Sequence, residues 1–544
     1  MGTQDDFQFY DTTLRDGTQQ EGLVLSVDDK LAVARCLDRL GVGFVEGGWP
    51  GAVPKDTEFF RRAATELSLA NAVLVAFGAT RRPGTSASAD PQVRALLTAG
   101  TEVVTLVAKS HPRHVELALR TTLAENLAAI GSTVRHLVHA GRRVFLDAEH
   151  FFDGHRANRD YALEVVRTAA EAGAETVVLC DTNGGSLPDE VGEVVADTLR
   201  STGVPLGIHC HDDCGCAVAN TMAAVASGAR HVQGTVHGYG ERCGNANLLT
   251  LAANLILKCG VPALPPGRLD DLAAVGRAVA EITGRSPAAG APYVGRSAFT
   301  HKGGLHASAL RVDSDLYQHI DPADVGNAMR TLVSDMGGRS SVLLKARELG
   351  YDVATAPEAV ARLATKVKEL EHRGHSFESA DASFELLLRG ELSANHGVPS
   401  VDVLLRRVET RADCGNLPRS SASVRLRVNG VQAEGDGSGD SPVDALDRAV
   451  HQALDPWFPR LRRLRLAEYQ VRLPAGGSGG RATARVLASF TDGRARLNTV
   501  GVGGDTDAAF FHALLDAVRY VLTPVGRPGG GVRASRQESA AAAH

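Results

Sequence analysis

The stretch PLGIHCH, residues 205–211, joins a short apolar run to two histidines at spacing i, i+2. A run of this kind is typical of a buried β-strand, and the histidines follow at its end. A second stretch, TTLRDG at 12–17, comes directly after the apolar run at 7–10 and carries Asp16. Two histidines and one carboxylate form a ligand set suited to a divalent metal. If both strands belong to one parallel barrel, the three side chains meet at its catalytic rim.

Alternating strand-like and helix-like segments fill the first 240 residues. The eight apolar or β-branched runs are 7–10, 43–46, 72–77, 103–107, 144–146, 176–180, 206–208 and 231–236. The helix-like segments between them are 27–40, 56–69, 90–99, 113–139, 160–172, 188–201 and 216–228. This alternation predicts a (β/α)8 TIM barrel. A doubly wound sheet is the alternative fold, although no Gly-x-Gly-x-x-Gly follows the first strand.

The character of the sequence changes twice after the barrel. A Gly- and His-rich stretch is followed by helical segments, and from about residue 400 alternating stretches indicate an α+β domain. Its predicted strands are 401–407, 422–429, 468–473 and 481–490, and its predicted helices are 442–454 and 505–522. We therefore expect four regions: the barrel 1–285, a helical linker subdomain 286–398, an α+β C-terminal domain 399–525 and a disordered tail 526–544.

Bulk composition narrows the classes of function. The chain has 544 residues, 44% of them hydrophobic and 22% charged, with a formal net charge of −5. This is globular composition, and it favours neither a nucleic-acid partner nor a membrane span. The polar, acidic N-terminus is unlike a signal peptide, and the eight cysteines form no dense framework. We therefore expect a cytoplasmic protein with reduced thiols.

Three of the cysteines, Cys210, Cys214 and Cys216, cluster beside the two histidines. A structural zinc site is one interpretation of this cluster. Small apolar side chains packed under a barrel rim are the other, and the absence of two well-spaced CxxC pairs favours it.

Polar residues follow most of the predicted barrel strands, where barrels place their catalytic groups. A metal held by the carboxylate and the two histidines leaves positions open for the carboxylate and keto oxygens of a 2-oxo acid, whose carbonyl it would polarise. Arg15 could stabilise a developing enolate or alkoxide, and Glu149 is a candidate acid/base. Thr182 could hydrogen-bond a substrate carboxylate. This set suits carbon–carbon bond formation at a ketone.

Several motifs resemble the 2-isopropylmalate synthase/homocitrate synthase/citramalate synthase family. They are DTTLRDG at 11–17, HCHDD at 209–213 and GYGERCGNANL at 238–248. Others are similar to its citramalate synthase branch: EGGWPG at 46–51, AKSH at 108–111, DAEHFFDG at 147–154, LVSDM at 332–336 and ADASFELL at 380–387. The resemblance covers nearly the whole chain. It implies an acyltransferase of isoleucine biosynthesis that condenses acetyl-CoA with pyruvate and hydrolyses the thioester to citramalate and CoA.

The resemblance also assigns roles to single residues. It implies that Asp16, His209 and His211 are metal ligands, with Asn245 in or beside the shell. Arg15, Glu149 and Thr182 carry over as substrate-binding or catalytic residues, and the side chains near Phe77, Val107 and Asp147 would select the acceptor.

A histidine and a tyrosine from the partner subunit complete the site in this family. GLHASA at 304–309 and DLY at 315–317 match those positions, so we expect His306 and Tyr317 in these roles and a homodimer. His301 is the rival of His306.

The C-terminal segments are similar to the family's effector domain, which implies inhibition by isoleucine. GDGSGD at 435–440 departs from the family's usual Gly-Pro pair, which leaves the effector open. His237 stands where many relatives carry Asn.

Three further points stay open at this stage. The metal can be Mn, Mg, Zn or Co, because the ligand set suits all four. Another 2-oxo acid can be the acceptor, or the barrel can belong to an aldolase or lyase. A binding protein that kept the fold without turnover is the non-enzymatic alternative.

Overall fold

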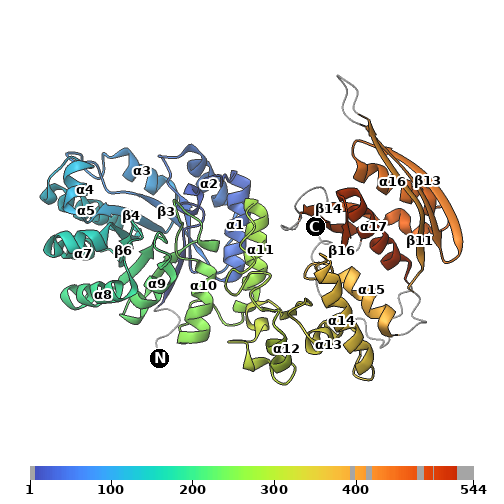
Figure 1. Ribbon diagram of the computed structural model, residues 1–544. Helices are drawn as coiled ribbons and strands as arrows, with labels where there is room; N and C mark the ends of the chain where they lie inside the picture. The colour runs from blue at the N-terminus through green and yellow to red at the C-terminus, as the bar shows by residue number, and fades with distance from the viewer. Residues whose placement is uncertain (1–6, 393–397, 412–418, 474–482, 494, 524–544) are drawn as a thin grey trace. The chain divides into compact units, whose positions relative to one another are not determined.

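A closed barrel of eight parallel strands forms the first part of the computed structural model (Figure 1). The structure describes residues 7–392, 398–411, 419–473, 483–493 and 495–523. The barrel strands are β1 (Gln8–Asp11), β2 (Phe44–Gly48), β3 (Val73–Ala79), β4 (Val103–Lys109), β5 (Arg143–Glu149), β6 (Thr176–Asp181), β7 (Leu206–Cys210) and β8 (His231–Gly234). They pair in sequence order, and β1 closes the barrel against β8. The predicted TIM barrel is confirmed, and the doubly wound alternative is wrong.

Helices on the outside of the barrel follow the strands in turn (Figure 1). They are α1 (Val27–Leu40), α2 (Pro54–Glu66), α3 (Pro91–Thr98), α4 (Pro112–Leu117), α5 (Leu123–His139), α6 (Phe151–Ala157), α7 (Arg159–Glu171), α8 (Pro188–Thr202) and α9 (Ala217–Ala226). α10 (Leu248–Ala253) and α11 (Leu272–Thr283) continue this unit. The single helix predicted over 113–139 is wrong: Arg120 has a φ of 54°, and the Thr122 side chain caps a new helix by accepting from the Glu125 N–H.

Aromatic side chains fill part of the barrel interior. Tyr10, Phe44 and Phe145 pack there with Val75 and Val103, and all five are buried. A much larger apolar cluster packs in the same unit and includes residues of the strands and of the surrounding helices. Because the interior is a packed core and not a pore, a substrate must bind at the rim.

Three barrel strands run further toward their carboxyl ends than the apolar runs predict. β4, β5 and β7 extend beyond residues 107, 146 and 208 and include Lys109, Glu149 and His209, respectively. These polar side chains lie at the carboxyl ends of the strands, where barrels place their sites, so hydrophobicity marks only the preceding part of each of these strands.

The chain divides into two compact units, residues 1–299 with 320–328, and 300–319 with 329–544. The second unit begins with the short parallel pair β9 (Thr300–His301) and β10 (Arg330–Thr331). Its helices are α12 (Gly304–Leu310), α13 (Arg339–Glu348), α14 (Pro357–His372) and α15 (Asp381–Leu392). The domain limits at 285, 398 and 525 stay predictions, and the tail at 526–544 lies outside the described residues.

Two three-stranded antiparallel sheets, each followed by one helix, end the described chain. The elements are β11 (Val401–Arg411), β12 (Arg419–Val428), β13 (Val431–Gly439), α16 (Pro442–Leu454), β14 (Arg465–Arg472), β15 (Ala484–Thr491), β16 (Arg496–Gly503) and α17 (Thr506–Leu522). The sequence reasoning missed β13 and β16. A Cβ on Gly437 would meet the Ala445 carbonyl oxygen at 2.2 Å, and one on Gly501 would meet the Ala509 oxygen at 1.9 Å. These glycines let a helix lie directly on each sheet, and they interrupt the apolar pattern of both strands.

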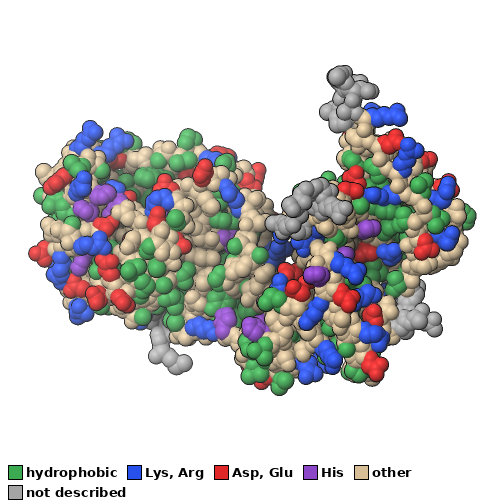
Figure 2. Space-filling model, viewed as in Figure 1, with side chains coloured by type: hydrophobic (Ala, Val, Ile, Leu, Met, Phe, Trp, Pro, Cys, Tyr) green, Lys and Arg blue, Asp and Glu red, His purple; other side chains and the backbone are tan. Residues whose placement is uncertain are grey.

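Acidic and basic side chains are interspersed on the face shown in Figure 2. Among the described residues, no helix has both the length and the apolar character needed to span a membrane.

Candidate metal centre and active site

Three buried side chains from opposite ends of the barrel sequence meet at its rim. Asp16 follows β1, His209 lies on β7, and His211 comes directly after it. The Asp16 Oδ2 atom lies 3.2 Å from His209 Nε2 and 3.9 Å from His211 Nε2. Within the described part of the chain, these three form the one group of His, Cys, Asp or Glu whose ligand atoms, all within 4.8 Å of one another, suit a metal ion.

The charges and open valences of this group suit a divalent cation. Burial alone would raise the pKa of Asp16, but Arg15 and His209 hold that pKa far below its usual range. Burial lowers the pKa of His211 to about 4, so its imidazole is neutral at pH 7 and has a lone pair for a metal. The buried Asp16 Oδ1 and Asn245 Oδ1 atoms have no hydrogen-bond partner among the described residues. Unpartnered buried oxygens beside two imidazoles fit a metal centre.

Arg15 is fixed beside this centre by three contacts. Its Nε donates to Glu46 Oε2 at 2.5 Å, and its terminal nitrogen lies 3.5 Å from Asp16 Oδ2. The guanidinium carbon stands 3.9 Å from the centroid of the Phe77 ring. Glu46 in turn accepts from the Tyr10 hydroxyl at 2.8 Å. The sequence motif EGGWPG at 46–51 contains Glu46 but does not show that it orients Arg15.

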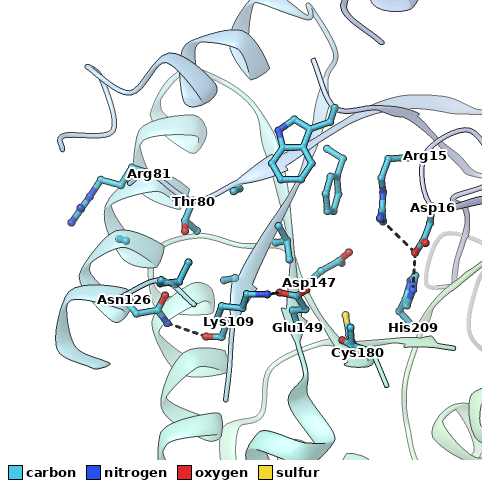
Figure 3. Close-up of a pocket in the computed structure, with 18 of the residues that line it drawn as sticks. Arg15, Asp16, Thr80, Arg81, Lys109, Asn126, Asp147, Glu149, Cys180 and His209 are labelled. Carbon is cyan, nitrogen blue, oxygen red and sulfur yellow. Dashed lines mark hydrogen bonds and ion pairs between the residues drawn. The ribbon is translucent and has the colours of Figure 1, made fainter. Parts of the chain in front are cut away.

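A cavity of about 530 Å³ opens above the three ligands. Its lining brings together nine of the predicted site residues: Arg15, Asp16, Phe77, Val107, Asp147, Glu149, Thr182, His209 and His211. Asn245 is not in this lining. Figure 3 shows Arg15, Asp16 and His209 linked at one side, with Asp147 and Glu149 facing the same space.

Glu149 is paired with a residue to which no role was assigned from the sequence. Its carboxylate forms an ion pair with Lys109, and both side chains are about a quarter exposed. The Lys109 backbone oxygen accepts from Asn126 Nδ2 at 2.9 Å, as Figure 3 shows. Because Lys109 holds Glu149 at the cavity wall, the carboxylate is oriented before a substrate arrives.

The Thr182 hydroxyl is also held in place, since it accepts from the His150 N–H at 2.8 Å. His150 has a φ of 58°, in the left-handed region that few residues other than glycine adopt. This strained turn directly follows Glu149 and gives the Thr182 hydroxyl its backbone donor.

His306 and Tyr317 belong to the second unit, where they lie together. Their rings stack with centroids 4.2 Å apart, and His301 lies 6.1 Å from His306 by the same measure. Both His306 and its alternative, His301, therefore stay candidates for the histidine of the site.

The seven described cysteines form no disulfide. Cys210 is buried, Cys216 is half-buried and Cys214 is exposed, so only Cys210 packs as an apolar filler. The three do not join a metal-ligand cluster among the described residues, and the zinc interpretation of this segment has no support.

A barrel of this topology, with a carboxylate and two histidines at its rim, belongs to the class of metal-dependent barrel proteins. Three family models match the chain. The HMGL-like model matches residues 6–278, the "Homocitrate synthase post-HMGL domain-like" model matches 293–375, and the "LeuA allosteric (dimerisation) domain" model matches 378–522. The chain belongs to the HMGL-like family, in the branch formed by the (R)-citramalate synthases.

Curated relatives place it in that branch. The "(R)-citramalate synthase" of Streptomyces coelicolor is 55% identical over 522 residues, covering 96% of this chain and 98% of the relative. Those of Synechocystis sp. and Aquifex aeolicus are each 45% identical, covering 94% of this chain and 95% and 97% of the relatives. The resemblance of the sequence motifs to this branch is therefore confirmed.

Proposed function

We propose that the chain condenses acetyl-CoA with pyruvate and hydrolyses the thioester, giving (R)-citramalate and CoA. The observation that carries this proposal is identity of 40% to 55% with five relatives named for that activity, over nearly their full length. The cavity supports it, because nine of the residues expected for this chemistry line one space at the barrel rim.

Asp16, His209 and His211 would hold the divalent metal, with Asn245 beside them. When bound, the metal acts as a Lewis acid that polarises the keto group of the acceptor. Mn, Mg, Zn and Co remain the candidates for the metal.

Arg15 and Thr182 bind and orient the acceptor. The Arg15 guanidinium, held by Glu46, stabilises negative charge that develops on the keto oxygen during attack. The Thr182 hydroxyl donates to the pyruvate carboxylate while accepting from the His150 N–H. Neither side chain has to move far, because each is already anchored at the rim.

The proton moves from the acetyl methyl group to a base on the protein. Glu149, held by Lys109, or the stacked pair His306 and Tyr317 supplied by the partner subunit of the proposed homodimer, takes this proton. The resulting enolate carbon forms a bond to the keto carbon of pyruvate, whose oxygen gains a proton. Water then cleaves the thioester and releases CoA as the thiol.

Phe77, Val107 and Asp147 limit the size of the acceptor. Phe77 is fixed between Arg15 and Trp49, whose indole crosses it edge-on with ring centroids 5.3 Å apart. A rigid aromatic wall favours a methyl over a larger group, and one methylene changes the selectivity by about 1–3 kcal/mol.

The C-terminal domain carries the regulation in this proposal, with isoleucine as inhibitor and a homodimer as the assembly. The match to a model described as an allosteric (dimerisation) domain supports both. Light scattering measures the mass in solution, and an isoleucine titration of the initial rate tests the effector. A monomeric mass would contradict the homodimer, and an initial rate unchanged at millimolar isoleucine would contradict inhibition by isoleucine.

The experiment for the reaction is release of CoA thiol from acetyl-CoA with a panel of 2-oxo acids, each with and without EDTA. The panel is pyruvate, 2-oxobutyrate, 2-oxoisovalerate, glyoxylate and 2-oxoglutarate. The proposal predicts the highest kcat/KM with pyruvate and loss of release in EDTA. A stronger rate with another acid would move the enzyme to a different acceptor, and no release with any acid would refute the acyltransferase.

A further inference from the structure

We propose that Gln233 is a positioning residue that fixes the imidazole of His209 in the form that ligates a divalent metal. The inference rests on the proposed function, because it concerns the same metal centre. Gln233 lies on β8, two residues after His231, and its side chain is fully buried.

Gln233 forms hydrogen bonds with a metal-ligand candidate and with a cavity residue. Its Oε1 atom lies 2.8 Å from His209 Nδ1, and its Nε2 donates to Asp147 Oδ1 at 3.0 Å. Asp147 lines the substrate cavity and is 3% exposed. One amide thus joins the metal centre to the wall of the acceptor pocket.

The neighbours of Gln233 determine which way its amide points. The Asp147 carboxylate faces the amide nitrogen, as does His231 Nε2 at 3.3 Å. His231 Nδ1 lies 2.8 Å from Gln8 Oε1, and Gln8 uses its own Nε2 to donate to Glu175. His231 therefore carries its proton on Nδ1, which makes its Nε2 an acceptor. Two acceptors at one end of the Gln233 amide place the NH₂ group there and the oxygen toward His209.

The orientation of this amide decides the state of His209. Because the Gln233 oxygen can only accept, His209 Nδ1 must carry a hydrogen. Its remaining nitrogen, Nε2, is then the atom that can donate a lone pair to a metal. Nε2 is also the atom nearest the Asp16 carboxylate, at 3.2 Å. A hydrogen bond to the second nitrogen of a ligating histidine orients the ring and raises its basicity, and its loss typically weakens metal affinity 10- to 100-fold.

Three variants test this role through Mn²⁺ affinity, measured from the EPR signal of free Mn²⁺ in titrations of the metal-free full chain. Gln233→Met keeps the length of the side chain and removes the acceptor, so we expect the Kd to rise 10- to 100-fold. Gln233→Glu keeps an oxygen that accepts from His209 Nδ1, and in its protonated form its O–H donates to Asp147 in place of the amide, so we expect a Kd within about threefold of wild type. Asn220→Leu is the matched control: it removes a fully buried amide whose Nδ2 donates to the Ser186 carbonyl oxygen at 2.8 Å and which contacts neither Gln233 nor a ligand candidate, so its Kd should stay at the wild-type value.

The relative Mn²⁺ affinities of the two Gln233 variants distinguish a positioning role from a packing role. A residue that serves only the packing of the barrel tolerates an apolar methionine better than a buried carboxylate. A Kd for Gln233→Glu as weak as that of Gln233→Met, or an unchanged Kd for Gln233→Met, would overturn the proposal. If Asp16→Asn binds Mn²⁺ as wild type does, the metal centre itself is wrong and both proposals fall.

A second measurement needs no Gln233 variant and so does not depend on its folding. In the Zn²⁺-loaded chain with ¹⁵N-labelled histidine, long-range ¹H–¹⁵N correlations report which ring nitrogen of His209 carries hydrogen. Spectra of His209→Asn identify the signal. We expect hydrogen on Nδ1 and metal on Nε2, and the reverse assignment would overturn the inference.

Discussion

Replacing Glu46 by glutamine should reduce turnover more than it reduces stability. The change replaces the ion pair between Arg15 Nε and Glu46 Oε2, 2.5 Å long, by a bond from the still cationic guanidinium to a neutral amide oxygen. Bonds with a charged partner contribute about 1.5–3 kcal/mol, and loss of the carboxylate charge moves this bond from the upper to the lower end of that range, so the free energy of unfolding should fall by about 1–1.5 kcal/mol. The single oxygen of the amide accepts from Arg15, so its NH₂ group faces the Tyr10 hydroxyl, which can accept from it and donate to the Thr105 hydroxyl at 2.8 Å.

The effect on catalysis is larger because Arg15 then has only Asp16, at 3.5 Å, as an anionic partner. A guanidinium drawn toward Asp16 no longer stands where the keto oxygen develops charge. Loss of one such donor typically costs about 10²–10³ in kcat. We therefore expect kcat for Glu46→Gln to fall by about 10²–10³, while the melting temperature falls by only a few degrees.

Steady-state CoA release and thermal unfolding by circular dichroism measure the two quantities. Glu175→Gln is the matched control, because Glu175 pairs with Arg143 through two 2.8 Å contacts before β6, at the other end of the barrel. We expect its kcat to stay within about threefold of wild type. A Glu46→Gln enzyme with kcat within threefold of wild type would refute the reasoning, and equal losses in both variants would point to a general loss of the fold.

Three further outcomes follow from the structure. Gly501→Ala puts a Cβ 1.9 Å from a helix carbonyl oxygen and should destabilise the C-terminal domain by about 1–3 kcal/mol. Gly504→Ala, whose Cβ would meet nothing within 4 Å, is the control and should not destabilise it. Equal changes in melting temperature for the two variants in differential scanning calorimetry would contradict this prediction. Burial lowers the pKa of His231 to about 3, so between about pH 6.5 and pH 3 this residue is protonated in the unfolded chain but not in the folded one. The free energy of unfolding should therefore decrease as the pH is lowered through this window, by up to about 1.4 kcal/mol per pH unit. Urea titrations from pH 7 to 4 should show a smaller slope for His231→Gln, and an unchanged slope would disprove the assignment. Thr182→Val removes the hydroxyl that accepts from the His150 N–H and is proposed to donate to the pyruvate carboxylate, so the KM for pyruvate should rise about 5- to 30-fold. Thr182→Ser keeps the hydroxyl and should keep the wild-type KM. Equal KM values for the two variants would exclude the contact with the carboxylate.

The barrel and most of its rim could be predicted from the sequence for physical reasons. Each barrel strand contains a short apolar or β-branched run, because strands covered on both faces must be apolar. Asp16, His209 and His211 follow or end such runs, and parallel strands bring their carboxyl ends to one edge. The three ligands could therefore be placed together although almost 200 residues separate them.

Other features have no local signal. Glu46 and Gln233 act by holding a neighbouring side chain, and their partners come from other strands, so spacing along the chain says nothing about them. Gln233 lies inside a run that predicts an apolar strand. The strands β13 and β16 carry glycine where a helix packs closely, so β13 has the composition of a loop and the apolar pattern of β16 is interrupted. Arg120 interrupts a helical pattern through its left-handed backbone conformation, which an arginine side chain does not predict.

The measurement that tests the central claim most directly is a single titration of the metal-free chain with Mn²⁺, followed by both EPR and CoA release from acetyl-CoA and pyruvate. The account predicts one bound Mn²⁺ per chain, with CoA release rising in proportion to that bound metal. Asp16→Asn should lose both signals together. Full CoA release from the metal-free chain, or an Asp16→Asn variant that binds one Mn²⁺ and releases CoA at the wild-type rate, would contradict the account.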